Sequence, residues 1–389
     1  MTELKKTALH AVHGNLGARF TNFGGWDMPL KYSSELEEHH AVRKAVGVFD
    51  LSHMGEVFVS GSQAAEFLDY ALISKISAVK VGKAKYSMIC TEKGTIIDDL
   101  ITYRLGEQEF LVVPNAGNVP AVAAALQERA AGFDVTVDNQ SENRSMIAVQ
   151  GPRAVEVMLD VVENVTDAPE GSGAGPTVKE AVEGVGYYAA FQGIVAGQPV
   201  IIARTGYTGE DGFEIIVKND GAEVVWAEAL AKATALEGKP CGLACRDTLR
   251  LEAGMPLYGN ELSLDLTPVD AGLGILAATK SKESFVGRDA IVKAKEEGTK
   301  QSLIGLVGEG RRAARGGYEI FAEGESGAAI GTVTSGALSP TLGHPIALAY
   351  VSADAVASGI VEGATVEVDI RGKRFPYKVV ALPFYKREK

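Results

Sequence analysis

The order of strands and helices predicted between residues 54 and 138 constrains the fold of this chain more than any other feature. Apolar alternation and helical spacing predict strand, helix, three strands, helix and strand in turn, at 54–59, 62–72, 84–90, 96–105, 109–113, 118–131 and 133–138. A run of three strands between helices is typical of an α+β sheet rather than of a doubly wound one. This segment is therefore predicted to be a ferredoxin-like α+β unit.

The rest of the chain divides into a mixed part and an all-β part. Ser34 to Glu37 has the sequence of a capping box, which predicts a helix through Ala45. The pattern further predicts a strand at 145–150, a mobile loop at 168–176, and helices at 152–162, 220–235 and 241–253. Beyond about residue 285, short strands alternate with glycine turns, at 303–307, 318–321, 328–334, 345–351, 364–370 and 375–382. That pattern predicts an all-β terminal domain, either a barrel or a jelly roll.

Length and charge exclude several classes of protein. A chain of 389 residues predicts two or three domains. The net charge of −12 argues against a nucleic-acid binder. No apolar run is long enough to span a membrane, and the first residues do not resemble a secretory signal. Three cysteines cannot form a disulfide framework, so we expect a cytoplasmic protein.

The residue types that usually mark metal and nucleophile sites occur without the expected spacing. Cys241 and Cys245 could share one helical face, but no second cysteine pair or histidine pair accompanies them. The phosphate-binding and nucleophile-elbow motifs are absent. We therefore expect no metal and no covalent nucleophile.

The segment RTGYTGEDGFE, residues 204–214, lies between two apolar strands and is rich in polar groups. Its glycines at 206, 209 and 212 allow positive φ angles and close approach of the backbone to a ligand. A simple hairpin turn would also explain the glycines. The two aromatic and three acidic residues in the same segment favour a binding loop.

Two adjacent aspartates occupy the predicted strand 96–105. Because alternate residues of a strand share a face, Asp99 lies with Ile97, Ile101 and Tyr103 on an apolar face. Asp98 lies on the opposite face, where we expect its charge to be solvated. A carboxylate among apolar side chains is costly unless it is paired. Asp99 is therefore the candidate functional residue, although a structural carboxylate that accepts backbone hydrogen bonds stays open.

Arg246 lies near the start of the predicted helix 241–253, where the helix dipole does not favour a cation. An arginine there is expected to meet a carboxylate of the protein or of a ligand. The alternative is an ordinary ion pair with Asp247 or Glu252.

Taken together, several segments resemble the aminomethyltransferase family, the T-proteins of the glycine cleavage system. The resemblance runs along nearly the whole chain. It rests on residues 22–30 (NFGGWDMPL), 39–56 (HHAVRKAVGVFDLSHMGE), 83–105 (KAKYSMICTEKGTIIDDLITYRL), 113–118 (VPNAGN), 204–214, 242–262 (GLACRDTLRLEAGMPLYGNEL), 268–274 (PVDAGLG), 335–351 (SGALSPTLGHPIALAYV) and 382–385 (LPFY).

The resemblance implies a fold and a reaction. The fold is a three-domain cloverleaf with folate in a central hole, which here divides into a first folate-binding α+β domain (1–51 plus 140–260), the ferredoxin-like domain (52–139, joined by 261–284) and the C-terminal β domain (285–389). In the reaction, ammonia is released from an aminomethyl group on the lipoyl arm of the H-protein. The one-carbon unit passes to tetrahydrofolate as the co-substrate, giving methylenetetrahydrofolate.

The family pattern also assigns roles to residues. The essential carboxylate corresponds to Asp99, in agreement with strand parity. Positions matching the folate-lining residues are Tyr86, Tyr103, Asn115, Tyr188, Tyr207, Glu214, Arg246 and Tyr385. At Met255 some relatives carry an aromatic residue, so pterin stacking is not expected there.

Two other classes of protein are expected to share this fold. Related folate enzymes, such as demethylases of methylated sulfur compounds and the folate domains of dimethylglycine and sarcosine oxidases, do not need the H-protein. A folate-binding regulatory or iron–sulfur assembly protein would carry a cysteine-centred signature in place of residues 204–214, which this chain lacks.

Overall fold

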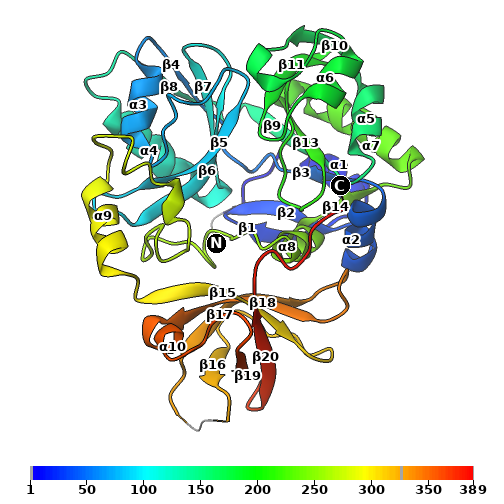
Figure 1. The fold of residues 1–389 in the computed structure, drawn as a ribbon. Coiled ribbons are helices and arrows are strands. Elements are labelled where there is room, and N and C mark those ends of the chain that lie inside the picture. The colour runs from blue at the N-terminus through cyan, green and yellow to red at the C-terminus, as the bar shows by residue number, and fades with distance from the viewer. Residues whose placement is uncertain (1–2, 325–326, 389) are drawn as a thin grey trace.

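The computed structural model describes residues 3–324 and 327–388, in which a hairpin and three sheets organise the chain (Figure 1). The N-terminal part contains α1 (His10–Asn15), the hairpin β1 (Arg19–Phe23) and β2 (Trp26–Lys31), and α2 (Glu35–Lys44). Among the described residues, no helix combines the length and apolar character needed to cross a bilayer.

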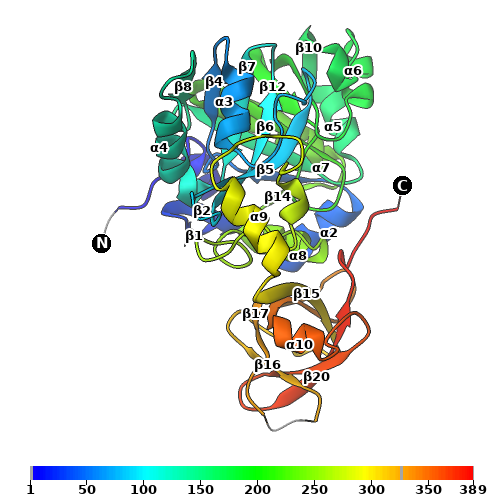
Figure 2. The ribbon, with the colours of Figure 1, turned by 60° about the vertical axis from the view of Figure 1, so that its left-hand side comes forward.

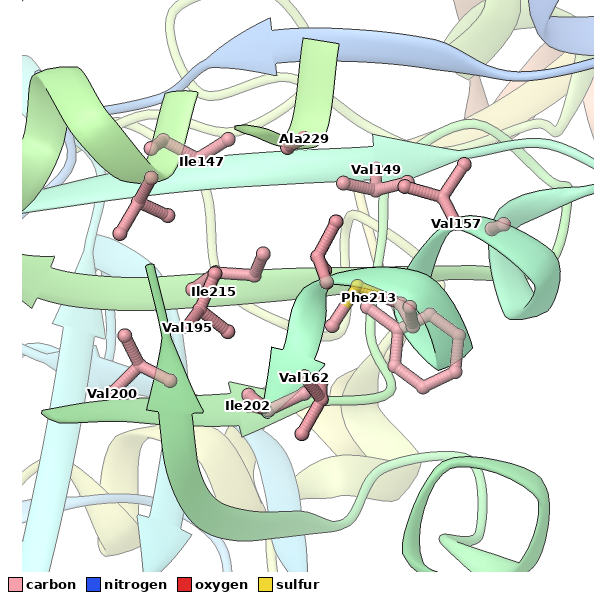
Figure 3. Packing of buried hydrophobic residues seen from close by; sticks show 14 of the residues in the cluster. Ile147, Val149, Val157, Val162, Val195, Val200, Ile202, Phe213, Ile215 and Ala229 are labelled. Carbon is pink, nitrogen blue, oxygen red and sulfur yellow. The ribbon is translucent and has the colours of Figure 1, made fainter. Parts of the chain in front are cut away.

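A seven-stranded sheet forms the largest layer. Its strand order is β10 (Val162–Asp167), β11 (Ala190–Val195), β12 (Gln198–Ala203), β13 (Gly212–Lys218), β9 (Arg144–Gln150), β3 (Gly47–Asp50) and β14 (Lys239–Cys241). Only the β3–β14 pair at the edge is parallel. The helices α5 (Ala154–Val161), α6 (Val178–Gly184) and α7 (Ala222–Ala235) cover one face, where Ile147, Phe213 and Ala229 pack in a wholly buried cluster (Figure 3).

A five-stranded sheet carries the predicted ferredoxin-like unit. Its order is β5 (Ala84–Cys90), β6 (Ile96–Arg104), β7 (Glu109–Pro114), β4 (Val57–Ser60) and β8 (Thr136–Asn139), with α3 (Ala64–Ala71) and α4 (Val119–Arg129) on one face. Every pair is antiparallel. The order β6-β7-β4-β8 with both helices is that of a split βαβ sheet, and β5 extends it at the edge. The predicted α+β class is confirmed.

The C-terminal strands close into a six-stranded barrel. They are β15 (Gln301–Gly308), β16 (Glu319–Ala322), β17 (Gly331–Leu338), β18 (Pro345–Ser352), β19 (Thr365–Asp369) and β20 (Arg374–Val380). The predicted all-β unit is thus a barrel rather than a jelly roll, with the short helix α10 (Ala353–Ala357) beside it. Helix α9 (Arg288–Glu297) precedes the barrel, and Figure 2 shows the barrel below both sheets.

The two sheets meet through the faces that their helices leave uncovered. A second apolar cluster joins Tyr103 and Leu111 of the five-stranded sheet to Met146, Ala203 and Ile216 of the seven-stranded one. Helix α8 (Leu243–Glu252) contributes Cys245 and Leu249 to the same cluster. The short 3-10 turns η1 (Ala116–Asn118), η2 (Glu170–Ser172), η3 (Asn219–Gly221) and η4 (Gly274–Leu276) complete the described elements.

One local prediction was wrong. The Ser34 side chain makes no capping hydrogen bond, although α2 begins directly after it. Instead, the buried Glu38 carboxylate accepts hydrogen bonds from the backbone N–H groups of Tyr32, Ser33 and Gly242. The predicted loop 168–176 contains η2 and the fully buried Ser172, and its mobility stays a prediction.

Candidate functional site

A cavity of about 360 Å³ opens where the two sheets, α8 and the N-terminal segment meet. Eight of the nine residues named from the sequence line it, namely Tyr86, Asp99, Tyr103, Asn115, Tyr188, Tyr207, Glu214 and Arg246. Met255 lines it too. Its volume is within the range of small-molecule sites.

Asp99 lies on the face of β6 that meets the cavity. Its carboxylate accepts hydrogen bonds from the Tyr86 hydroxyl and the Asn115 amide nitrogen, each at 2.9 Å. Both partners also line the cavity, so the polar group is held at its wall by residues of β5 and the β7–η1 connection. The carboxylate is therefore oriented from two sides before any ligand binds.

Asp98, on the opposite face, differs from expectation. It is fully buried rather than solvated, because α3 and α4 cover that face of the sheet. The carboxylate accepts hydrogen bonds from the Asn115 backbone N–H (2.8 Å), the Asn115 amide (2.9 Å) and the Asn118 amide (2.6 Å). Asp98 thereby fixes the backbone and side chain of Asn115, the residue that also contacts Asp99.

Burial disfavours the ionised form of both carboxyl groups. It raises the pKa of Asp98 to about 7, with a further contribution from the neighbouring charge of Asp99. It raises the pKa of Asp99 to about 6, against the lowering effect of the Tyr86 hydrogen bond. At neutral pH each of these two carboxyl groups is therefore close to its pKa. Carboxyl groups with such raised pKa values are common in functional sites.

Glu214 places a second acidic group at the cavity wall, from β13. Its carboxylate accepts a hydrogen bond of 2.5 Å from the Thr205 hydroxyl and a longer one of 3.5 Å from Tyr103. Burial raises the pKa of Glu214, and the positive charge of Arg246 opposes that rise.

Arg246 lies over the ring of Tyr207, with its guanidinium carbon 4.7 Å from the ring centre. Neither ion pair considered from the sequence forms: Asp247 pairs with Arg250, and Glu252 pairs with Arg43. Among the described residues Arg246 has no salt-bridge partner, so its charge is available to the cavity.

The binding loop needs its glycines for two different reasons. Gly209 has a φ of +83°, which side-chain-bearing residues rarely adopt. Gly206 and Gly212 have no such φ, but a Cβ atom there would lie 2.0 and 2.3 Å from atoms of the Gln150 side chain. The close packing of Gln150 thus holds the loop against β9.

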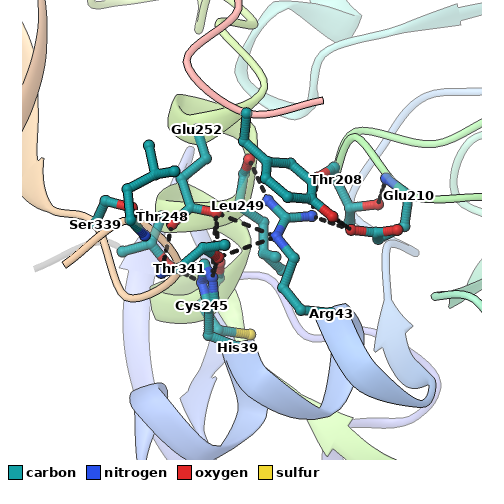
Figure 4. Close-up of polar contacts among 12 residues, drawn as sticks. His39, Arg43, Thr208, Glu210, Cys245, Thr248, Leu249, Glu252, Ser339 and Thr341 are labelled. Carbon is teal, nitrogen blue, oxygen red and sulfur yellow. Dashed lines mark hydrogen bonds and ion pairs between the residues drawn. The ribbon is translucent and has the colours of Figure 1, made fainter. Parts of the chain in front are cut away.

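A buried polar network holds the outer side of this loop (Figure 4). The Arg43 guanidinium donates to the Thr208 carbonyl oxygen at 2.7 Å and to the Glu210 carboxylate at 2.8 Å. On its other side it donates to Glu252 at 2.8 Å. Tyr385 joins this network rather than lining the cavity: its hydroxyl donates to Glu210 at 2.9 Å and its ring lies 4.1 Å from Arg43.

Several cavity residues were not singled out from the sequence. They include Phe23, His53, Met54, Met146 and Tyr258. The only sequence signal of Phe23, His53, Met54 and Tyr258 was their membership of the blocks 22–30, 39–56 and 242–262, and Met146 lies in none of the blocks.

Among the described residues, no group of three or more histidine, cysteine or acidic side chains could hold a metal ion. Cys241 and Cys245 are both buried, and their thiols contact backbone carbonyl oxygens. The cavity wall itself offers carboxylates, an arginine and aromatic rings.

Comparison with known proteins gives a consistent result along the chain. Residues 9–281 match the model of the GCVT N-terminal domain, and residues 301–386 match that of the glycine cleavage T-protein C-terminal barrel domain. The chain is 79% identical to an aminomethyltransferase of Corynebacterium jeikeium over 390 residues, covering all of both chains. It is 40% identical to an aminomethyltransferase of Bacillus subtilis, covering 99% of this chain and 100% of that protein.

A solved structure shares the whole fold. The crystal structure of glycine cleavage system aminomethyltransferase T from Bartonella henselae superimposes with a TM-score of 0.86 at 36% identity, covering 98% of each chain.

Proposed function

Because the chain belongs to the T-protein family of the glycine cleavage system, whose members are aminomethyltransferases, we propose the specific reaction that it catalyses. It releases ammonia from an aminomethyl group on the lipoyl arm of the H-protein. It transfers the one-carbon unit to tetrahydrofolate, giving methylenetetrahydrofolate. The observation that carries this proposal is one cavity lined by Asp99, Glu214 and Arg246 together with several tyrosines.

The residues of the cavity fit a folate. A pterin is flat and has a donor-rich edge, which suits the buried Glu214 carboxylate as an acceptor. Tyr86, Tyr103, Tyr188 and Tyr207 supply aromatic surface, and Asn115 and Arg246 supply polar contacts at the wall. Tetrahydrofolate supplies the nitrogen that accepts the one-carbon unit. Tyr385 acts indirectly in this proposal, through Glu210 and the loop.

Asp99 is the proposed catalytic residue. Its carboxylate stabilises the positive charge that develops at the transferred carbon as the amine departs. Tyr86 and Asn115 hold it in one orientation, so little reorganisation is needed during the reaction. The apolar wall, which includes Ile101 and Val113, limits water around the reacting groups.

The partner proposed is the lipoylated H-protein, and the compartment proposed is the cytoplasm. With a net charge of −12 on the chain, contact with a carrier protein depends on local surface charge rather than overall attraction. No nucleic acid and no membrane takes part in this proposal.

One assay tests the reaction. Purified protein is mixed with aminomethylated H-protein, with and without tetrahydrofolate, and ammonia and methylenetetrahydrofolate are measured. We expect fast ammonia release only when tetrahydrofolate is present. If free sarcosine or dimethylglycine were turned over as fast as the aminomethylated H-protein, the proposal would be contradicted. The chain would then be assigned to the folate enzymes that need no carrier protein.

A further inference from the structure

His53 is a cavity residue whose polar atoms are not used by the protein. It lies in the turn between β3 and β4, where the Met54 N–H donates to the Leu51 carbonyl oxygen at 2.9 Å. Its side chain is almost wholly buried and lines the cavity. The ring meets that of Phe23 edge-on, with 5.5 Å between the ring centres, so its orientation is fixed by packing.

Neither ring nitrogen of His53 has a hydrogen-bond partner among the residues that the structure describes. Nδ1 is buried and unpaired, and Nε2 makes no hydrogen bond to those residues either. His13 and His39, which are equally buried, each bond through both nitrogens to side-chain oxygens. Buried polar groups normally have partners, so an unpaired imidazole in a cavity wall indicates a group held for a ligand.

The imidazole is neutral at physiological pH. Burial and the positive charge of Arg246 together lower the pKa of His53 to about 4, against the opposing effect of the Asp50 carboxylate. A neutral ring offers one N–H donor and one nitrogen acceptor. It adds no charge to the cavity and can pair with a heterocycle that has both donors and acceptors.

We propose that His53 is a binding residue for tetrahydrofolate, forming a hydrogen bond to the ring system of the folate through a ring nitrogen. This inference rests on the function proposed above and adds a residue that the family pattern did not supply. The charges of Arg246 and Asp50 act on the imidazole in opposite directions, and the ring itself carries no charge. Because a neutral ring offers no negative charge to a protonated amine, the uncharged folate ring is the expected partner rather than the aminomethyl group.

Nitrogen NMR tests the contact directly. The unmodified protein is labelled with 15N-histidine and titrated with tetrahydrofolate under anaerobic conditions, without H-protein. We expect a large shift of one His53 ring nitrogen at saturation. The ring signals of His344, which lies outside the cavity and contacts the Pro345 carbonyl oxygen, serve as the internal control and should not move.

Calorimetry gives a second readout. His53→Leu is expected to weaken tetrahydrofolate binding about five- to 100-fold, because it removes the hydrogen-bonding partner of a buried ligand atom. His53→Asn, which keeps a donor and an acceptor, should recover part of that loss. If His53→Leu does not fold, the NMR titration of the unmodified protein still decides the question.

The outcomes separate the two proposals. Folate binding with unmoved His53 ring signals would overturn this inference and leave the proposed function intact. No folate binding by the unmodified protein would overturn the proposed function and this inference with it. Movement of the His53 signals only when the aminomethylated carrier is added would assign the residue to the amine instead, and would also overturn the inference.

Discussion

At the scale of single residues, the two aspartates of β6 have different tasks despite being adjacent. Asp99 meets the cavity, whereas Asp98 is enclosed beneath the helices and anchors Asn115. Asn115 in turn contacts both carboxylates. A change at either aspartate therefore affects the site, but through different physical effects.

The first prediction concerns Asp99→Asn, which keeps the size of the side chain and removes its charge. If the carboxylate stabilises developing positive charge, turnover should fall at least about 100-fold. Tetrahydrofolate affinity should change much less, because the interaction strengthens mainly in the transition state. Steady-state kinetics and calorimetry measure the two effects.

The control for this variant is Asp289→Asn, since the side chain of Asp289 is 98% exposed on α9. Asp98→Asn is unsuitable as a neutral control because Asp98 is buried and accepts three hydrogen bonds. Near-normal turnover of Asp99→Asn would contradict the catalytic assignment.

The second prediction is a pH dependence of stability from Asp98. Its folded pKa of about 7 lies above the ordinary value of 3.8, so the folded state binds the proton more tightly than the unfolded state. Its contribution to stability is present below pH 3.8 and is lost as the pH rises towards 7. Asp98→Asn removes this titration and adds a pH-independent cost from the altered hydrogen bonds.

Unfolding by urea at pH 5 and pH 8 measures this effect. The stability of the unmodified protein relative to Asp98→Asn should be at least about 1 kcal/mol more favourable at pH 5 than at pH 8. If the difference in stability between the unmodified protein and Asp98→Asn were the same at pH 5 and pH 8, Asp98 would not titrate in this range.

At the scale of elements, the binding loop depends on α2 and α8. Arg43 of α2 contacts Thr208 and Glu210 of the loop on one side and Glu252 of α8 on the other. The Arg43, Glu210 and Glu252 side chains are nearly or fully buried. A planar guanidinium can donate hydrogen bonds to the loop and to α8 at the same time, whereas a lysine ammonium is a single point of charge.

The third prediction is that Arg43→Lys loosens the loop. The variant should lose about 1–3 kcal/mol of stability, because at least one buried carboxylate or carbonyl loses its donor. Tetrahydrofolate should bind more weakly as well, since Gly206 and Tyr207 of this loop line the cavity. Denaturation and calorimetry measure both changes, with exposed Lys44→Met as the control. Unchanged folate affinity in Arg43→Lys would limit the network to a purely structural role.

At the scale of the whole molecule, Glu252 joins the barrel to the rest of the chain. Besides Arg43 and His39, it accepts hydrogen bonds from the Ser339 hydroxyl at 2.5 Å and from the Thr341 backbone N–H at 3.0 Å. Both residues follow β17 of the barrel. Despite burial, His39 lowers the pKa of Glu252 to about 2, with smaller contributions from the Ser339 hydroxyl and the charge of Arg43.

The fourth prediction concerns Glu252→Gln. Since the folded pKa lies below the ordinary 4.5, the carboxylate stabilises the fold above pH 4.5 and loses that effect as the pH falls towards 2. The variant should be about 3 kcal/mol less stable at pH 7, and the difference should shrink at pH 3. Thermal unfolding at the two pH values, with exposed Glu319→Gln as control, measures this. An unchanged difference at pH 3 would contradict the charge-based explanation.

The amino-acid pattern alone predicted the local elements and the family. Period-two and helical patterns predicted the α+β class, and β5 begins and ends where expected, at Ala84–Cys90. Strand parity correctly set Asp98 and Asp99 on opposite faces, because alternation is a property of the strand backbone. The family pattern named eight residues that the fold brings to one cavity, seven of them within the quoted blocks.

Which face of β6 is exposed to solvent, and which distant residues meet, depended on tertiary packing. Strand parity cannot say what covers a face, so Asp98 was expected to be solvated although α3 and α4 bury it. The placement of Tyr385 on Arg43 and the unpaired nitrogen of His53 also depend on contacts between segments far apart in the chain. Burial and hydrogen-bond pairing are properties of packed surfaces, and no local pattern of residues encodes them.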